Sequence, residues 1–131
     1  MEGPGEPYSM FKYSRMGNPT VLELRMNLAA LDDAKYALAM NAGTSAISTT
    51  MMLLKHEDHM IMVDDVYAGT QKYLRDIYGP RIGWSEGKGY DYCDCTNVDN
   101  LKAAFKENTK MVWIEGQTNP TLKVAHIEAL A

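Results

Sequence analysis

The stretch HMIMVDDVY, residues 59–67, decides the fold of this chain. Its core, Met60–Val63, is apolar without interruption, as expected for a strand of a parallel sheet that is covered on both faces. A helical pattern from about Gly69 to Tyr78 follows it, and a second apolar run, Met111–Glu115, is rich in residue types that strands favour. Strands that alternate with helices predict an α/β domain with a mainly parallel sheet and flanking helices.

The remaining elements are predicted from caps, periodicity, and glycine and proline content. Asn18 and Pro19 suit the cap and the first turn of a helix whose apolar residues, from Val21 to Leu31, recur at helical spacing. Tyr36–Gly43 is a short apolar run and predicts a buried strand, although its alanines do not favour strands. The other expected elements are a helix over Ser45–Leu54, a loop over Gly79–Gly89, a short strand over Tyr90–Cys95, a helix capped by Asn97 and a helix from Val124.

The composition is that of a globular protein and argues against several classes. The 131 residues, 46% hydrophobic and 23% charged, match the length of one ordinary domain. A net charge of −4 disfavours a nucleic-acid partner, and no apolar run approaches the ~20 residues that span a bilayer, so we expect no membrane partner. The N-terminus has no apolar signal core, and the two cysteines form no disulfide framework. We therefore expect a cytoplasmic protein.

Three polar segments follow the predicted strands, over residues 41–45, 64–70 and 115–121. In parallel sheets, ligands bind beyond the carboxyl ends of the strands. We therefore expect these three segments to converge on one ligand site.

Two of these segments offer chemistry, and each also has a plainer explanation. Gly43 and Thr44 open a predicted helix, where backbone N–H groups and the macrodipole favour an anion such as phosphate. An ordinary capped turn between strand and helix is the plainer explanation. Tyr67 can stack on a flat ligand and exchange protons, or simply pack on the next helix. Asp64 or Asp65 would then serve only as the cap of that helix.

The third segment and the region before the first helix offer further polar groups. Glu115 and Asn119 present an acceptor and an amide to a ligand, or Asn119 holds its own turn. Tyr13 and Arg15 precede the first helix, and the guanidinium fork of Arg suits phosphate, although a solvated surface Arg is the commoner case. The histidines are scattered and Cys93-Asp-Cys95 lacks a second ligand pair, so we expect no metal site.

Four motifs occur in order along the chain: YSRMGNPT, AMNAGTSAIST, MVDDVYAGTQKYLR and MVWIEGQTNPTLKVAHIEALA. Together they resemble the pyridoxal-phosphate enzymes of cysteine and methionine metabolism, and among these the cystathionine γ-lyases. The resemblance covers almost everything from Tyr13 to Ala131. It implies part of the fold-type-I large domain of the aspartate-aminotransferase kind, over residues 13–131, truncated at its C-terminus and preceded by an irregular arm over residues 1–12.

The resemblance also implies a role for each candidate residue around pyridoxal 5'-phosphate. Gly43 and Thr44 match the loop whose amides hold the cofactor phosphate. Tyr67 matches the tyrosine that stacks on the pyridine ring and assists proton transfer, which makes it the candidate catalytic residue. Glu115 and Asn119 match residues around the ring, with the Asn near its phenolic oxygen.

Tyr13 and Arg15 match residues that reach the phosphate bound in a neighbouring subunit. The resemblance therefore implies a shared site in a homodimer within a tetramer. The implied reaction acts on a small amino-acid substrate and converts cystathionine to cysteine, 2-oxobutanoate and ammonia.

The reaction also needs a lysine that carries the cofactor and an aspartate that keeps its pyridine nitrogen protonated, both of which lie after this region in the family. Lys110 is rejected as that lysine because it opens a predicted strand at the amino end. We therefore expect a fragment or short isoform that is inactive alone.

Three alternatives stay open. The chain is a non-catalytic module that pairs with a full-length subunit, or it is a generic α/β phosphate-binding domain. It is otherwise another member of the family, such as a cystathionine γ-synthase or a methionine γ-lyase. Methionine γ-lyases often carry a reactive Cys two residues after the stacking tyrosine, where this chain has Gly69, so the resemblance favours a cystathionine γ-lyase.

Overall fold

The computed structural model describes residues 11–130, so the expected arm over residues 1–12 lies almost wholly outside the described residues. The chain divides into two compact units, Met1–Ala46 and Ile47–Ala131. Helix α2, Gly43–Met51, contributes its first turn to the first unit and the rest to the second. Its first residue lies two positions before the helix start that the sequence predicts.

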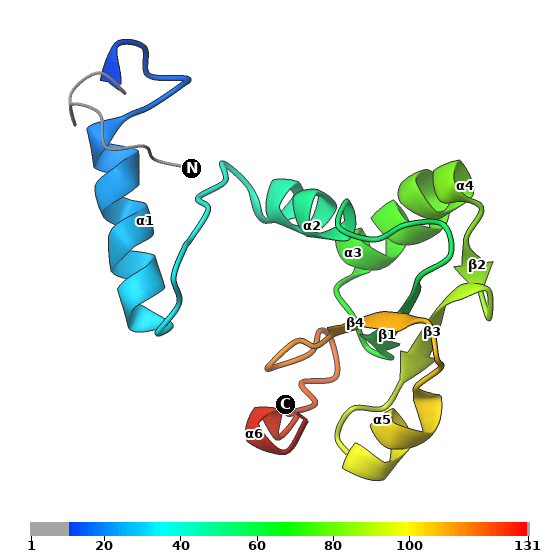
Figure 1. Ribbon diagram of the computed structural model, residues 1–131. Helices are drawn as coiled ribbons and strands as arrows, with labels where there is room; N and C mark the ends of the chain where they lie inside the picture. The colour runs from blue at the N-terminus through cyan, green and yellow to red at the C-terminus, as the bar shows by residue number, and fades with distance from the viewer. Residues whose placement is uncertain (1–10, 131) are drawn as a thin grey trace. The chain divides into compact units, whose positions relative to one another are not determined.

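The first unit contains one long helix, α1, over Pro19–Leu31, as the sequence predicts (Figure 1). The Asn18 side chain accepts hydrogen bonds from the N–H groups of Thr20 and Val21, at 2.9 and 3.2 Å. This cap satisfies two donors that a helix leaves free at its start, and Pro19 has no donor to satisfy. Ala29 is the buried residue of α1.

The predicted strand over Tyr36–Gly43 is wrong. Residues 36–40 have no regular secondary structure, and Leu38 is 69% exposed. A strand is stabilised by hydrogen bonds to a neighbouring strand, and within residues 11–130 no strand pairs with this segment. Its alanines add little β propensity of their own.

The second unit is built on a four-stranded parallel sheet in the order β2-β3-β1-β4. The central strand β1, His59–Val63, pairs with β3, Gly89–Cys93, on one side and with β4, Thr109–Trp113, on the other. The short β2, Ser85–Glu86, extends the sheet beyond β3. The predicted strand with the core Met60–Val63 and the predicted strands at residues 90–95 and 111–115 are therefore confirmed, with small shifts at their ends.

Helices cover both faces of this sheet. In Figure 1, α3, Ala68–Lys72, and α4, Gly79–Ile82, lie above the sheet, whereas α5, Val98–Ala104, and α6, Ile127–Leu130, lie below it. A π-helical segment, η2 over Tyr73–Tyr78, joins α3 to α4. The α/β class with a parallel sheet and flanking helices is therefore confirmed.

The predicted loop over Gly79–Gly89 is wrong in its first half. Residues 79–82 form the short helix α4, which begins at Gly79 and ends at Gly83, where φ is 73°. Pro80 fits there because it stands in the first turn, where its missing N–H removes no hydrogen bond. A glycine suits the left-handed angle at the end of the helix.

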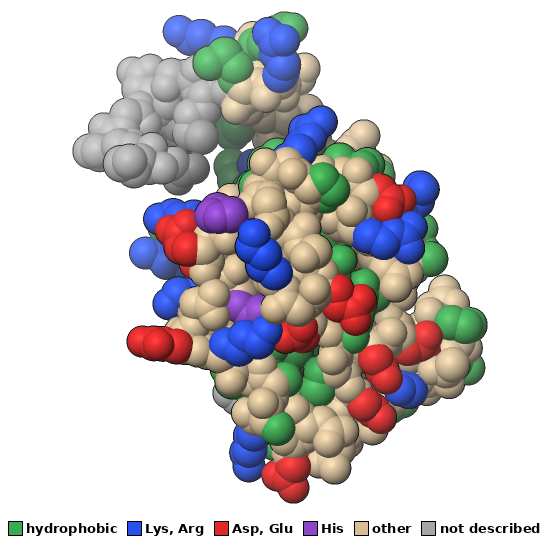
Figure 2. All heavy atoms as spheres, turned by 90° about the vertical axis from the view of Figure 1, so that its right-hand side faces the viewer, with side chains coloured by type: hydrophobic (Ala, Val, Ile, Leu, Met, Phe, Trp, Pro, Cys, Tyr) green, Lys and Arg blue, Asp and Glu red, His purple; other side chains and the backbone are tan. Residues whose placement is uncertain are grey.

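The core of the second unit lies around β1, whose five residues are all buried. Met60, Ile61 and Met62 are fully inaccessible to solvent, which is the burial that their uninterrupted apolar run predicts. Leu74 and Tyr78 pack on this core from η2 and Leu101 packs from α5. On the face drawn in Figure 2, acidic and basic side chains are interspersed. Among residues 11–130, no helix has the length and apolar character that crossing a membrane requires.

Candidate functional site

The carboxyl ends of β1 and β4 lie at one edge of the sheet because the two strands are parallel neighbours. Met62 pairs with Trp113, so the segments that follow these strands leave the sheet together. The Glu115 carboxylate accepts a hydrogen bond from the backbone N–H of Tyr67, with 3.0 Å to each carboxylate oxygen. The structure therefore brings together Tyr67 and Glu115, two of the predicted site residues.

Asp65 joins the same two segments through a larger set of bonds. Its Oδ2 accepts from the Thr118 hydroxyl at 2.7 Å, from the Thr121 N–H at 2.9 Å and from the Thr121 hydroxyl. The bonds from Thr121 and Thr118 hold the pKa of the Asp65 carboxyl below its ordinary value. Asp65 therefore links the segment after β1 to the turn after β4 by hydrogen bonds. It does not cap the next helix, whose N-cap is Tyr67 without a side-chain bond.

Lys123 forms further ion pairs at this edge of the sheet, which the sequence did not predict. Its Nζ lies 2.7 Å from Asp64 Oδ2 and 3.6 Å from Asp94 Oδ2, and the bond to Asp64 raises the pKa of Lys123. The backbone N–H of Asp64 donates to the Cys93 carbonyl at 2.9 Å. The ends of β1 and β3 are thereby fixed to the turn over residues 118–123. The sequence gives no local signal for a bond that spans 59 residues.

Tyr67 combines the two interpretations that the sequence left open. Its ring lies against Gly69 in the first turn of α3, where an added Cβ would overlap the ring atom Cε1. That contact is packing on the next helix, as the plainer interpretation expects. The residue is nevertheless 48% exposed, which leaves much of a flat aromatic surface open to a ligand.

Asn119 lies in the exposed turn that follows β4, before a cis peptide bond to Pro120. The turn is held by Asp65 and by two bonds between Thr118 and Lys123, at 3.0 and 2.9 Å. The alternative that Asn119 holds its own turn is therefore not needed. Within residues 11–130 its side chain forms no hydrogen bond to Tyr67 or Glu115, so its role at the site stays a prediction.

Gly43 and Thr44 begin helix α2 and are both exposed. The first N–H groups of a helix have no partner within it, and a Cβ placed on Gly43 would meet nothing within 4 Å. An anion would therefore meet no steric obstacle at Gly43 itself. These two residues belong to the first unit, so the convergence of residues 41–45 with the other two segments stays a prediction.

Tyr13 and Arg15 form a small structure of their own before α1. The N–H groups of Met16 and Gly17 both donate to the Tyr13 carbonyl, at 2.9 and 3.0 Å, and close a turn. The Arg15 guanidinium lies over the Tyr13 ring, 5.0 Å from its centre. This cation–π contact orders an otherwise exposed Arg.

Metal-binding and reactive-thiol chemistry find little support in the described part of the chain. Among residues 11–130 no three His, Cys, Asp or Glu side chains gather as metal ligands. Burial raises the pKa of the Cys93 thiol, and it raises that of Cys95 to about 12. Thiols of such high pKa are poor nucleophiles and poor metal ligands at neutral pH.

Comparison with known proteins places this arrangement in context. A human cystathionine gamma-lyase is 45% identical over 131 residues, and the match covers 98% of this chain and 30% of that protein. A cystathionine gamma-lyase of Dictyostelium discoideum is 41% identical over 128 residues, covering 98% of this chain and 32% of that protein. The crystal structure of cystathionine gamma-lyase from Lactobacillus plantarum, complexed with L-serine, matches with a TM-score of 0.83 and 28% identity, covering 99% and 33% of the two chains.

The chain thus spans about a third of the length of the curated relatives it matches. The sequence profile described as "Cys/Met metabolism PLP-dependent enzyme" matches residues 2–131, which is nearly the whole chain. The parallel sheet with its flanking helices is part of the fold-type-I domain of these enzymes. The chain therefore belongs to the Cys/Met metabolism family of PLP-dependent enzymes.

Proposed function

We propose that a full-length subunit containing this chain acts as a PLP-dependent carbon–sulfur lyase of transsulfuration, in which water and cystathionine give cysteine, 2-oxobutanoate and ammonia. The observation that carries the proposal is the exposed Tyr67 ring at the carboxyl edge of the sheet, with its backbone held by Glu115. Family membership and 41–45% identity to cystathionine gamma-lyases support the same reaction. We further propose that the protein works in the cytoplasm.

The residues present fit the family's cofactor, pyridoxal 5'-phosphate. A half-exposed tyrosine offers a flat surface on which a pyridine ring stacks. The start of α2, open at Gly43, offers N–H groups and a positive helix end to a phosphate. When bound, the cofactor supplies an electron sink for cleavage at the γ-carbon.

Each proposed residue then has a distinct task. The Tyr67 ring orients the cofactor, and its hydroxyl moves a proton near the substrate. Glu115 acts as a positioning residue, because both its oxygens face the Tyr67 N–H. Gly43 and Thr44 bind the phosphate of their own subunit, and Asn119 binds near the ring oxygen. These residues can act together only when the fold of the family brings them into one site.

We propose that Tyr13 and Arg15 reach the phosphate in a neighbouring subunit of a dimer within a tetramer. The exposed, preordered guanidinium of Arg15 supports this role. We also propose that residues 1–131 by themselves are inactive, and the place of Lys110 in β4, at the amino end of the sheet and away from Tyr67 and Glu115, supports this. A non-catalytic role, pairing with a full-length subunit, is the second candidate.

Gly69 favours a cystathionine γ-lyase over a methionine γ-lyase. The Tyr67 ring occupies the space that a side chain at position 69 would enter. A cysteine at that place, which the resemblance associates with methionine γ-lyases, would require the ring to move. The observed packing therefore supports the reaction that does not use such a cysteine.

The decisive measurement is the affinity of the purified chain for pyridoxal phosphate, monitored by the quenching of tryptophan fluorescence. Loss of the stacking surface in Tyr67→Ala should weaken binding about tenfold, which corresponds to about 1.4 kcal/mol. Tyr36→Ala is the matched control, because Tyr36 is also exposed, at 78%, and lies outside the proposed site. Equal effects of the two changes would contradict the role of Tyr67.

Turnover and assembly are measured separately. The chain alone should release no 2-oxobutanoate from cystathionine, and turnover would contradict the proposed inactivity. Size-exclusion of the chain co-expressed with a full-length cystathionine gamma-lyase tests the pairing role. A single co-eluting peak supports it, and two separate peaks contradict it.

A further inference from the structure

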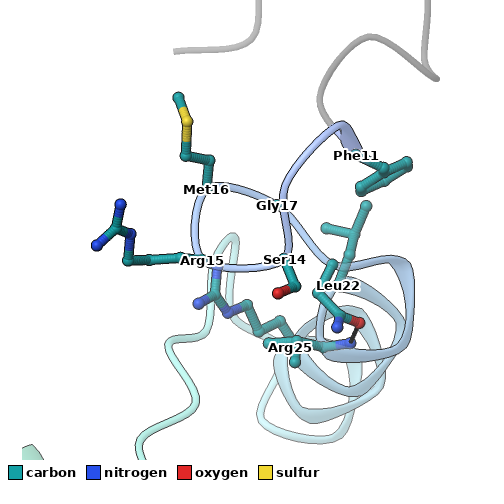
Figure 3. Close-up of a pocket in the computed structure, with 9 residues that line it drawn as sticks. Phe11, Ser14, Arg15, Met16, Gly17, Leu22 and Arg25 are labelled. Atoms are coloured by element: carbon teal, nitrogen blue, oxygen red, sulfur yellow. Dashed lines mark hydrogen bonds between the residues drawn. The ribbon is translucent and has the colours of Figure 1, made fainter.

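The two turns that carry proposed ligand-binding residues are held in different ways. The turn over residues 13–17 is closed by two bonds between backbone groups of its own residues. Figure 3 shows it beside a small cavity at the amino end of α1, with the Arg15 side chain extending away from the helix. The turn over residues 118–123 is held instead by side chains, and one of them is Asp65, more than 50 residues earlier in the chain.

Thr118 connects the two ends of this second turn. Its side chain is buried, at 2% exposure, whereas the neighbouring Asn119 is exposed. The Thr118 hydroxyl donates to Asp65 Oδ2 at 2.7 Å and accepts from the Lys123 N–H at 2.9 Å. Because a hydroxyl has one hydrogen to donate, these two bonds fix its direction. Through this hydroxyl, the Asp65 carboxylate is linked to the far end of the turn.

Asn119 is fixed on its other side as well. Thr121 donates to the same Asp65 oxygen through its N–H, at 2.9 Å, and through its hydroxyl. The ring of Pro120, between these residues, fixes its φ angle. One carboxylate oxygen thus accepts three hydrogen bonds from the two residues that flank Asn119-Pro120. The exposed amide of Asn119 is thereby held at the carboxyl edge of the sheet, the edge at which Tyr67 lies.

The same turn contains a strained residue. Leu122 has a φ of 58°, in the left-handed region that a residue with a Cβ rarely adopts. Its N–H donates to the Thr118 carbonyl at 3.2 Å, and the Thr118 N–H donates to the Lys123 carbonyl at 3.0 Å. Backbone strain persists only where the surrounding structure over-determines it, and it clusters at ligand-binding and active sites. The strain at Leu122 therefore supports a functional reason for holding this turn in one conformation.

We propose that Thr118 is a positioning residue for the lyase reaction, which holds the Asn119 amide in place for the cofactor ring without touching the cofactor itself. This inference rests on the proposed function, because that function gives Asn119 its ligand. A preordered amide loses less conformational freedom when it binds, so the buried Thr118 hydroxyl should raise the affinity for the cofactor.

The first measurement reads the turn without any cofactor. Relaxation of the ¹⁵N-labelled chain gives the order parameter of the Asn119 backbone N–H, which should be about 0.85, as in a rigid backbone. Thr118→Val keeps the branched shape of the side chain but removes both hydrogen bonds of the hydroxyl. It should lower the order parameter at Asn119 below about 0.6. Thr118→Ser keeps a hydroxyl and should restore the higher value.

The second measurement is the affinity for pyridoxal phosphate, monitored by the quenching of tryptophan fluorescence. Asn119→Ala should weaken binding about tenfold, as expected for the loss of a hydrogen bond. Thr118→Val should weaken binding by at most the same factor. In the Asn119→Ala background, Thr118→Val should cause no further loss, because Thr118 acts through Asn119.

Two further variants control for general effects on the fold. Thr20→Val makes the same change at an exposed position of α1 and should leave both measurements unchanged. Thr121→Val, also at an exposed position, removes one of the three bonds to Asp65 and should lower the order at Asn119 by a smaller amount than Thr118→Val. Circular dichroism verifies that each variant is folded.

Two results would overturn the proposal. The first is an Asn119 N–H that is as well ordered in Thr118→Val as in the unaltered chain. The second is a Thr118→Val change that weakens cofactor binding equally with Asn119 present and with Asn119 replaced. Absence of cofactor binding, or no effect of Tyr67→Ala, would instead count against the lyase proposal, and the order parameters would still decide whether Thr118 holds Asn119.

Discussion

Residues 47–130 and residues 11–46 carry motifs of one enzyme family but bury them to very different degrees. In the second unit, all five residues of β1 are buried and helices cover both faces of the sheet. In the first unit, α1 buries Ala29, whereas Leu24, Leu28 and Leu31 are 49, 40 and 82% exposed. Packing therefore stabilises the second unit, and a local cap defines the start of the only long helix described in the first.

The largest expected effect comes from core truncation in β1. Ile61→Ala removes buried methyl groups and leaves a cavity, so it should lower the free energy of unfolding by about 3 kcal/mol. The matched change Leu28→Ala, at an exposed position of α1, should cost less than about 1 kcal/mol. Urea unfolding followed by circular dichroism measures both. A Leu28→Ala cost as large as that of Ile61→Ala would mean that the apolar face of α1 is covered in solution.

A smaller, local effect is expected from the hydrogen bonds that Asp65 accepts at the edge of the sheet. Asp65→Asn keeps the size of the side chain but removes the charge that accepts from Thr118 and Thr121. Amide exchange of Thr121 should accelerate, whereas the Tyr67 amide, held by Glu115, should keep its protection.

Glu115→Gln is the matched counterpart and should produce the reverse pattern. Hydrogen exchange followed by NMR reads both amides in each variant. Loss of protection at both amides in either variant would show that the two sets of hydrogen bonds act as one unit.

Because the pKa of Asp65 is lowered in the fold, its contribution to stability should be complete above its ordinary pKa of 3.8 and should be lost as pH falls through the lower folded value.

The smallest effect is a pH response that only the second unit should show. His59 is buried between Thr109, at 2.8 Å from Nδ1, and Asp91, at 3.2 Å from Nε2. Burial and the nearby Lys106 lower its pKa, against the opposing effect of Asp91. The unfolded chain therefore binds the proton more readily, so stability should be complete above pH 6.5 and should fall as pH drops toward the folded pKa.

Urea unfolding at pH 7.5 and pH 5.5 measures this response. His59→Gln removes the titrating group and should make the stability nearly equal at the two values. The circular dichroism of the first unit should not change over this range, because residues 1–46 contain no histidine. An unchanged pH dependence in His59→Gln would contradict the assignment.

The strands and caps of this chain were predictable because their signals are local. Met60–Val63 is an uninterrupted apolar run, and the structure buries all of it in β1. Asn18 and Asn97 cap α1 and α5 as their positions indicate. The strand predicted over Tyr36–Gly43 was wrong because an apolar run becomes a strand only beside a partner.

The site was only partly predictable because its hydrogen bonds join residues that lie far apart in the sequence. The rule that ligands meet the carboxyl ends of parallel strands brought Tyr67 and Glu115 into one hypothesis, and the structure places them in contact. The bonds from Thr118 and Thr121 to Asp65 span more than 50 residues, and no periodic pattern marks them. Lys123 was missed for the same reason, because a charged residue alone carries no sign of its surroundings.

The sequence by itself determined the α/β class, the position of the central strands and the family, because periodicity, caps and motif order are properties of neighbouring residues. Only the tertiary structure decided which groups meet. Asp65 links the ends of two strands by hydrogen bonds, and Gly69 leaves room for the ring of Tyr67. Burial and hydrogen bonding depend on residues that are distant in sequence, and folding alone brings them within a few ångströms of each other.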